Sequence, residues 1–387
     1  MLAPAGCAPD AAAFEADERT PSRHDQFEPD NQETDEALEL EISYTGEFAS
    51  VASGGVRKGA RYLDNLLVSV EADLDALGLA EGTSVHVSGL YNNGSSISEL
   101  AGDAFAVSNI ETGTRAARLY EAWVEKSFAS GTSVKLGLYD LNSEFDHLEP
   151  ANLFIGSSHG IGAEMGQTGL NGPSIFPATS LALRIEQVLS PDLTARAAVL
   201  DGVPGSVEDP GATRISLSSA EGALGIVELD GRFGAMRLLL GHWRYSALFD
   251  AYDGARARGN AGSYARAEAM LMEGQDLQVE GFARFGTAAS RFNMFSSYAS
   301  AGIKATNIAA FADEAGIAIA YGRTSRGYRN FPGAASSEMA IEATFSKQIA
   351  PWFRVQPSLQ YIIRPSADRG IDNAIVPALR FEFSHSF

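Results

Sequence analysis

The sequence predicts an all-β protein: a sixteen-stranded antiparallel transmembrane β-barrel with short periplasmic turns, longer external loops and one loop folded inward as a constriction. Three observations predict this fold. Apolar and polar residues alternate with a period of two along most of the chain. The connections between these segments are alternately short and long. The last segment is an amphipathic strand that ends at Phe387.

The alternation starts at Leu38 and continues to the last residue. In the first segment, Leu38, Leu40, Ile42 and Tyr44 alternate with Glu39, Glu41, Ser43 and Thr45. Each segment is close to the ~9–11 residues that a tilted strand needs to cross a bilayer. The predicted strands are 38–49, 62–75, 83–91, 115–128, 131–142, 179–189, 192–202, 221–232, 234–249, 262–275, 277–287, 296–307, 314–325, 335–348, 352–363 and 374–387.

The connections support a barrel that spans a membrane. Short links such as 129–130 and 190–191 alternate with long ones such as 92–114, 143–178 and 203–220. Bacterial outer-membrane barrels have an even number of strands, short periplasmic turns and longer external loops. A soluble β-sandwich has no reason to alternate its loops in this way.

The net charge of −20 is concentrated near the N-terminus, where residues 1–41 hold twelve acids against Arg19 and Arg23. We expect a disordered acidic tail over residues 1–37 and a barrel over residues 38–387. Residues 1–8 read either as the remnant of a signal peptide or as part of an ordinary disordered terminus. The chain has no basic footprint, so it is not expected to bind nucleic acid.

The residues that enzymes use are scattered. The six histidines show no metal-ligand spacing and Cys7 is the single cysteine, so neither a metal nor a cofactor is expected. The acidic pairs Glu121/Glu125 and Glu268/Glu280 are compatible with a glycosidase acid and nucleophile. In a barrel, lumen-facing charge is the commoner meaning of such pairs, and we therefore expect no enzyme.

On the strand face opposite the apolar side chains, the predicted strands carry charges of both signs. They are Arg184, Arg196, Arg266, Arg284, Arg354 and Arg380, with Glu186, Glu268, Glu280, Glu342 and Glu382. A lumen lined in this way offers hydrogen-bond donors and acceptors to neutral polyols such as sugars. Trp123, between Glu121 and Glu125, is the predicted aromatic contact for a sugar ring. The alternative reading is that these arginines and glutamates pair with one another and that Trp123 only packs on the wall.

The longest connection, 143–178, follows the fifth strand. A sixteen-stranded barrel has a wide lumen, so some segment must narrow it. We expect this one to do so, with Phe154, Glu164 and Phe176 as its constriction residues. An external lid is the alternative.

Several motifs resemble the opening strands of the carbohydrate-selective (OprB-like) porins. They are Tyr-Thr-Gly-Glu-Phe at 44–48, Val-Ser-Gly-Leu-Tyr-Asn-Asn-Gly at 87–94, Leu-Tyr-Glu-Ala-Trp-Val-Glu at 119–125 and Lys-Leu-Gly-Leu-Tyr-Asp-Leu-Asn at 135–142. The resemblance implies an outer-membrane channel that passes glucose-like sugars without energy input, through a pore narrowed by inward loops. Glu47, Glu121, Trp123 and Glu125 lie within the matching motifs.

The resemblance also implies partners: small carbohydrates, outer-membrane lipid and the barrel-assembly machinery, for which the terminal Phe387 resembles the recognition signal. It leaves a homotrimer open. Two other functions stay in competition. One is a general or weakly cation-preferring porin, favoured by the negative net charge. The other is a secreted all-β lectin or glycoside hydrolase.

Overall fold

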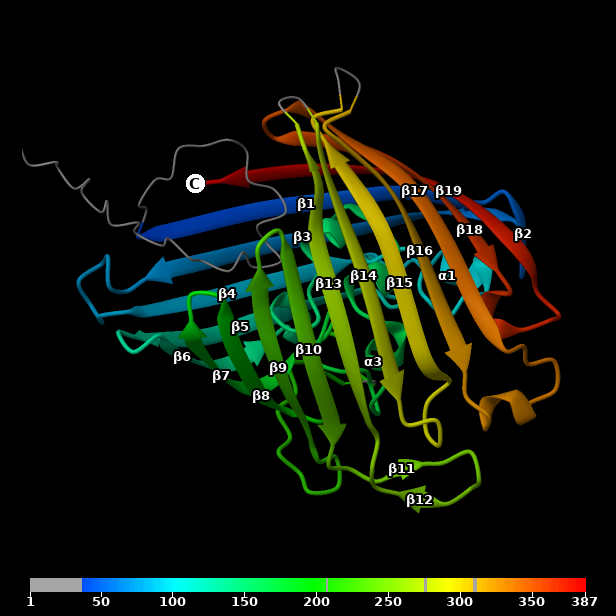
Figure 1. The fold of residues 1–387 in the computed structure, drawn as a ribbon, viewed down its shortest axis with the longest axis horizontal. Coiled ribbons are helices and arrows are strands. Elements are labelled where there is room, and N and C mark those ends of the chain that lie inside the picture. Colours follow the sequence, from blue (N-terminus) through cyan, green and yellow to red (C-terminus); the bar gives the residue numbers. More distant parts are fainter. Residues whose placement is uncertain (1–36, 207, 275–276, 309–311) are drawn as a thin grey trace, which may run out of the picture.

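Sixteen long strands form a closed antiparallel barrel in the computed structural model, which describes residues 37–206, 208–274, 277–308 and 312–387 (Figure 1). The strands are β1 (Leu38–Val51), β3 (Gly59–Asp73), β4 (Thr83–Asn92), β5 (Ala116–Phe128), β6 (Thr132–Tyr139), β7 (Ser180–Ser190), β8 (Leu193–Asp201), β9 (Ala223–Phe233), β10 (Met236–Tyr245), β13 (Ala261–Glu273), β14 (Gln278–Ala288), β15 (Phe295–Thr306), β16 (Glu314–Thr324), β17 (Ser337–Ala350), β18 (Phe353–Ile363) and β19 (Asp372–Ser386). Each predicted strand overlaps one of them, so the predicted fold class is confirmed.

The barrel closes where the first strand meets the last. β1 pairs with β3 on one side and with β19 on the other, and Glu47 lies opposite Arg380 across this seam. The short strand β2 (Ser53–Gly55) adds to β19, and β11 (Phe249–Asp250) with β12 (Arg256–Ala257) forms a separate small hairpin. Closure leaves the sixteen-strand sheet without a free edge.

The two faces of the wall differ as the period of two predicts. Outward side chains are apolar and exposed, for example Leu240, Phe285, Ile317 and Leu359. Inward side chains are largely polar or charged and buried inside the barrel. This arrangement is the reverse of a soluble protein and fits a barrel surrounded by lipid.

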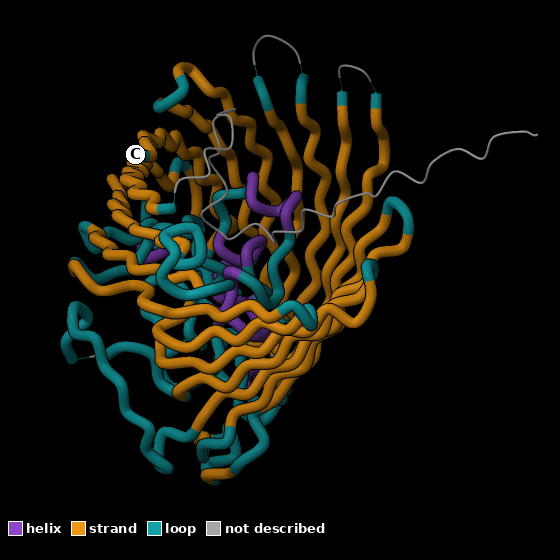
Figure 2. Tube along the Cα trace, turned by 90° about the vertical axis from the view of Figure 1, so that its left-hand side faces the viewer, coloured by secondary structure: helices purple, strands orange, loops and turns teal. Residues whose placement is uncertain are grey.

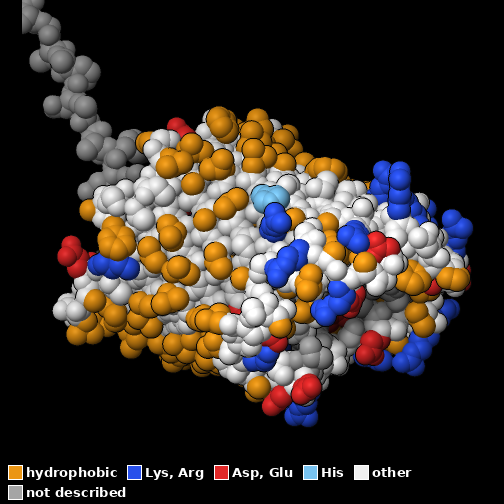
Figure 3. Space-filling view, turned by 90° about the horizontal axis from the view of Figure 1, so that it is seen from below, with side chains coloured by type: hydrophobic (Ala, Val, Ile, Leu, Met, Phe, Trp, Pro, Cys, Tyr) orange, Lys and Arg blue, Asp and Glu red, His pale blue; other side chains and the backbone are white. Residues whose placement is uncertain are grey.

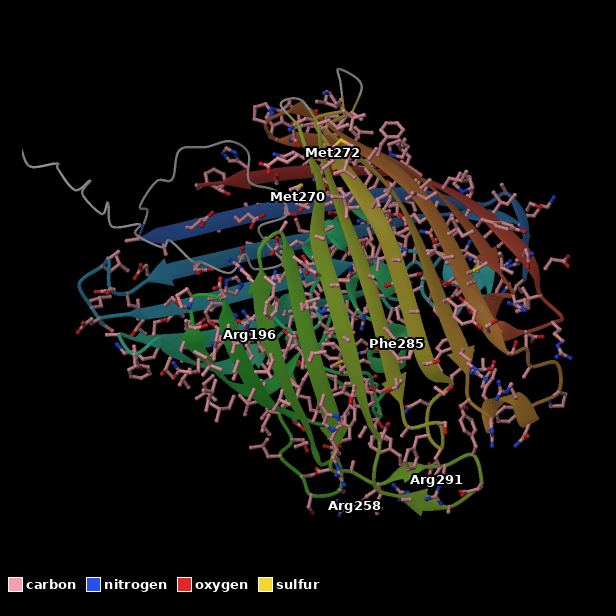
Figure 4. The ribbon with its side chains drawn as sticks, viewed as in Figure 1. Arg196, Arg258, Met270, Met272, Phe285 and Arg291 are labelled. Atoms are coloured by element: carbon pink, nitrogen blue, oxygen red, sulfur yellow. The ribbon has the colours of Figure 1, made fainter. Side chains whose placement is uncertain are left out.

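The connections differ in length between the two ends of the barrel. One end has turns such as 129–131, 191–192 and 234–235, while the other has loops such as 93–115 and 140–179. Met270 and Met272 lie at the short-turn end, and Arg258 lies at the loop end (Figure 4). The predicted tail of residues 1–37 falls almost wholly outside the described residues, and β1 begins at Leu38.

Two strands depart from the simple alternation. On β5 a register shift opposite Ser88 and Gly89 leaves Tyr120 as an extra residue. Simple alternation with Ala122 and Val124 predicts that Tyr120 faces outward, and this prediction is wrong: its side chain is buried and its hydroxyl donates to Asp140. On β10, Trp243 is fully buried and points inward, where it packs in an apolar cluster with residues of the 140–179 loop.

The 140–179 loop contains the short helices η2 (Leu141–Ser143), η3 (Glu149–Leu153), α2 (Ser157–Gly160) and α3 (Ala163–Gly166), and the 93–115 loop contains α1 (Ser98–Ala101). Figure 2 shows the helices within the ring of strands. Two further one-turn helices, η4 (Tyr328–Asn330) and η5 (Pro365–Ala367), lie in connections at the loop end. Within the described part of the chain, every helix is too short or too polar to cross a membrane.

Candidate functional site

The candidate site is the part of the lumen that the two inward loops narrow. The 140–179 loop is attached to β17 by a single carboxylate. Glu342 accepts hydrogen bonds from the backbone N–H of Ile155 at 2.8 Å and of Gly156 at 2.9 Å. A buried carboxylate satisfied by backbone N–H groups fixes a loop more firmly than a neutral acceptor, because charge-assisted hydrogen bonds are stronger.

The same loop is attached through Asp146 to a second part of the wall, on the same side of the ring as β17. Its carboxylate pairs with Arg284 on β14 and lies 3.6 Å from Arg266 on β13. Its backbone N–H donates to Glu228 on β9 at 3.0 Å. These arginine and aspartate side chains are completely covered. Removing one partner of such a buried group would leave an uncompensated charge, so the contacts hold the loop in place.

Glu164 and Phe154 complete the contacts that attach the loop to the wall. Glu164 lies 3.6 Å from Arg284 and is buried. Phe154 packs edge-on against Phe282 of β14 with 5.9 Å between ring centres. Burial lowers the pKa of His159, beside Phe154, to about 4 and keeps its ring neutral near pH 7.

The 93–115 loop also folds inward, although no pattern in its own residues indicated this. The N–H groups of Ala104 and Phe105 donate to Glu338 on β17. At its other end, Asn109 accepts from Arg380, which also pairs with Glu47 at 2.7 Å. The predicted lining residues Glu47 and Arg380 therefore hold this loop at the barrel seam.

The two loops contact each other inside the barrel. Asn109 N–H donates to the Ile155 carbonyl at 2.8 Å, and Ser157 N–H donates to the Ala106 carbonyl at 3.1 Å. Because both loops are attached to the wall as well, together they narrow the lumen.

A second group joins two predicted residues, Glu125 and Arg184, with Lys135 and Glu144; the two glutamates keep 17 and 12 % of their side-chain surface, and the two cations keep 9 % or less. Glu125 and Glu144 interleave with Lys135 and Arg184. Lys135 lies 3.2 Å from Glu125 and 2.6 Å from Glu144, and Arg184 lies 2.8 Å and 2.6 Å from the same two carboxylates. Burial alone would raise the pKa of Glu144, but the two cations hold it well below its usual range. The two carboxylates and the two cations nearly cancel in charge.

Trp123 lies beside this group. Its indole stacks on His86 of β4 with 5.1 Å between ring centres, and the Lys135 ammonium of β6 lies 4.1 Å from its ring centre. Glu121 accepts from the Asp140 N–H at 2.9 Å. Trp123 is thus placed between a histidine and a cation, and its flanking glutamates are already engaged by other partners.

The remaining predicted residues lie at other places on the wall. Arg196 pairs with Glu186, Arg354 pairs with Glu314, and Phe176 meets Tyr120 edge-on at 6.3 Å. Exposure separates two groups of predicted lining residues. Glu125, Glu186 and Arg354 keep 17, 20 and 17 % of their side-chain surface, whereas Arg266, Arg284 and Glu47 keep none. Only the first group can meet a solute in this conformation.

Some residues of the site were missed. Glu228 and Glu338 follow the inward parity of their strands and could have been found by it. Lys135 could have been found in the same way, since it alternates with the outward Leu136 on β6. Asp146 could not, since nothing in a loop sequence indicates which distant arginine a carboxylate will meet. Within the described ranges, no group of three or more potential ligands is placed to hold a metal ion.

A closed sixteen-stranded barrel with an apolar outside, a charged inside and a lumen narrowed by inward loops defines a porin. The family model for the carbohydrate-selective porin, OprB family, matches residues 57–385, and the chain belongs to this family. It is 22 % identical to Porin B of Pseudomonas aeruginosa, over 90 % of this chain and 87 % of that protein.

Solved structures show the same fold. The high-pH structure of Pseudomonas putida OprB matches with a TM-score of 0.79 at 18 % identity, covering 91 % of this chain and 95 % of that one. A triple mutant of the Rhodopseudomonas blastica porin matches with a TM-score of 0.54 at 12 % identity, covering 90 % and 100 %. The protein is a channel of the bacterial outer membrane through which small carbohydrates diffuse.

Proposed function

We propose that sugars are selected beside the inward loops, on the wall formed by β5, β6 and β7. The group that selects them consists of Glu125, Lys135, Glu144 and Arg184, with Trp123 beside it. The observation that carries this proposal is a nearly neutral set of interleaved charges, in which two partly exposed carboxylates are held by two buried cations. Such a surface offers many donors and acceptors without a net field. It therefore suits a neutral polyol better than an ion of either sign.

The most deeply buried arginines have another role in this proposal. Arg266, Arg284 and Arg380 hold the inward loops against the wall and do not touch the solute. Their charges set the width of the passage indirectly, because the loops they hold are what narrows it.

The experiment is liposome swelling with purified protein and a panel of neutral sugars. We expect monosaccharides to enter faster than trisaccharides, and Arg184→Lys and Glu125→Gln to weaken saturation by glucose. Arg256→Gln, on the outer β11–β12 hairpin, serves as the matched control. Unchanged saturation in both lumen variants would refute the proposed site. A strong cation preference in reversal potentials would instead favour the general, cation-preferring porin.

The finer partner predictions are proposals as well. We propose that outer-membrane lipid meets the apolar outer face, that the barrel-assembly machinery recognises the strand ending at Phe387, and that the barrel assembles as a homotrimer. Phe387 supports the second of these, since its side chain is exposed while its backbone pairs with Leu40. Analytical ultracentrifugation in detergent tests the trimer.

A further inference from the structure

A row of polar side chains crosses the outer face of five neighbouring strands near the loop end. Direct cross-strand pairs link one side chain to the next, from β10 through β13, β14 and β15 to β16. The row consists of His242, Ser263, Thr287, Ser297 and Arg323. All five share the outward face of the wall, and His242 Nδ1 lies 2.9 Å from the Ser263 hydroxyl.

The next outward row toward the short-turn end is entirely different. It consists of Leu240, Ala265, Phe285, Ala299 and Tyr321, paired in the same register. Phe285 lies on the strand part of the barrel, whereas Arg258 and Arg291 lie beyond the strand ends (Figure 4). The polar row therefore marks the boundary of the apolar band.

The charges at this boundary have one sign. Arg244 follows His242 two residues later on the same face, and Arg323 stands at the far end of the row. Both arginines are exposed, and within the described residues neither has an acidic partner. The outward positions of these two rows hold no carboxylate. Figure 3 shows arginine and lysine side chains, with some acidic ones among them, toward the loop end, beside a surface rich in hydrophobic side chains.

Several arginines of the external loops also have no carboxylate partner among the described residues. Arg244 and Arg323 differ from them because they lie on the strand wall, directly beside the apolar band, which points to an anion at the membrane surface. Guanidinium groups bind phosphate oxygens in a bidentate manner, and hydroxyls supply further donors. At a boundary between an apolar band and water, the phosphate of a lipid headgroup is the anion that is present at the right depth.

We propose that this row binds phosphate-bearing lipid headgroups of the leaflet at the loop end, one at Arg244 with His242 and Ser263 and another at Arg323 with Ser297. The two ends lie four strand spacings apart, which is about 19 Å at ~4.8 Å each. A single phosphate cannot bridge them, so the row holds two headgroups.

The test is a titration of the folded barrel in neutral detergent with lipid A, followed by native mass spectrometry. We expect the Arg244→Gln/Arg323→Gln variant to bind lipid A about tenfold more weakly than the unaltered protein, which corresponds to ~1.4 kcal/mol. The control variant Arg256→Gln should bind as the unaltered protein does, because Arg256 already pairs with Asp250. Replacing both arginines by lysine should restore part of the affinity.

Equal lipid A affinity in the double glutamine variant would overturn the proposal, and so would equal affinity for lipid A stripped of its phosphates. Binding of inorganic phosphate as tight as that of lipid A would assign the row to free phosphate. Loss of self-association in the variant without loss of lipid would assign it to a second copy. The single variants are measured alongside in case the double variant folds poorly. Sugar flux should not change, which separates this test from that of the sugar site.

Discussion

The carboxylate of Glu342 accepts a hydrogen bond from the backbone N–H of Ile155 at 2.8 Å, across 187 positions of sequence. Its second oxygen accepts from the next N–H, that of Gly156. One strand residue thus fixes the middle of the loop that narrows the lumen.

Glu342→Ala should therefore widen the channel. The change leaves two buried N–H groups without an acceptor, at a cost of roughly 1–3 kcal/mol each. We expect a higher single-channel conductance and faster entry of trisaccharides. Glu280→Gln is the control, since Glu280 pairs with Lys304 on the next strand. Identical conductance in the alanine variant and the unaltered protein would show that this contact does not set the width.

Trp123→Ala tests the aromatic part of the proposed sugar site. Because the indole lies between His86 and Lys135, its loss removes both a surface for the sugar ring and the packing that positions Lys135. We expect weaker glucose block of the ion current with small-ion conductance unchanged or slightly raised. Planar-bilayer recordings measure both. Unaltered glucose block would make Trp123 a wall-packing residue only.

Val68→Arg and Glu71→Arg test the two faces of β3. Val68 is exposed on the outward face, whereas Glu71 faces inward and lies 3.3 Å from His86. An arginine in lipid costs about 2–4 kcal/mol near the midplane, and one in the lumen costs little. Urea unfolding in lipid vesicles should show the loss only for Val68→Arg. Equal stability of the two variants would contradict the assignment of the faces.

Deletion of Phe387 should reduce insertion into the outer membrane while export continues. The exposed terminal ring is the proposed signal for assembly, and the rest of β19 keeps its pairing with β1. Heat-modifiable mobility of membrane fractions measures the folded amount. Full insertion of the shortened chain would remove Phe387 from the signal.

The strands were predictable because lipid outside and a polar lumen inside force opposite side chains to alternate, and this pattern is local. The contacts that attach the inward loops to the wall were not predictable. Asp146 meets Arg284 across 138 positions, and no periodicity links them. The inward course of the 93–115 loop was missed for the same reason. The bulge at Tyr120 was not predicted. A single extra residue reverses which side chains face inward without changing the composition of the strand.

Glucose block of the ion current in the unaltered protein tests the central claim most directly. Ion current through a single barrel in a planar bilayer is recorded as glucose is added to both sides. A binding site within the passage predicts that the current falls along a saturable curve, with little preference between cations and anions. A current that falls only in proportion to the viscosity of the solution would contradict sugar selection in this channel.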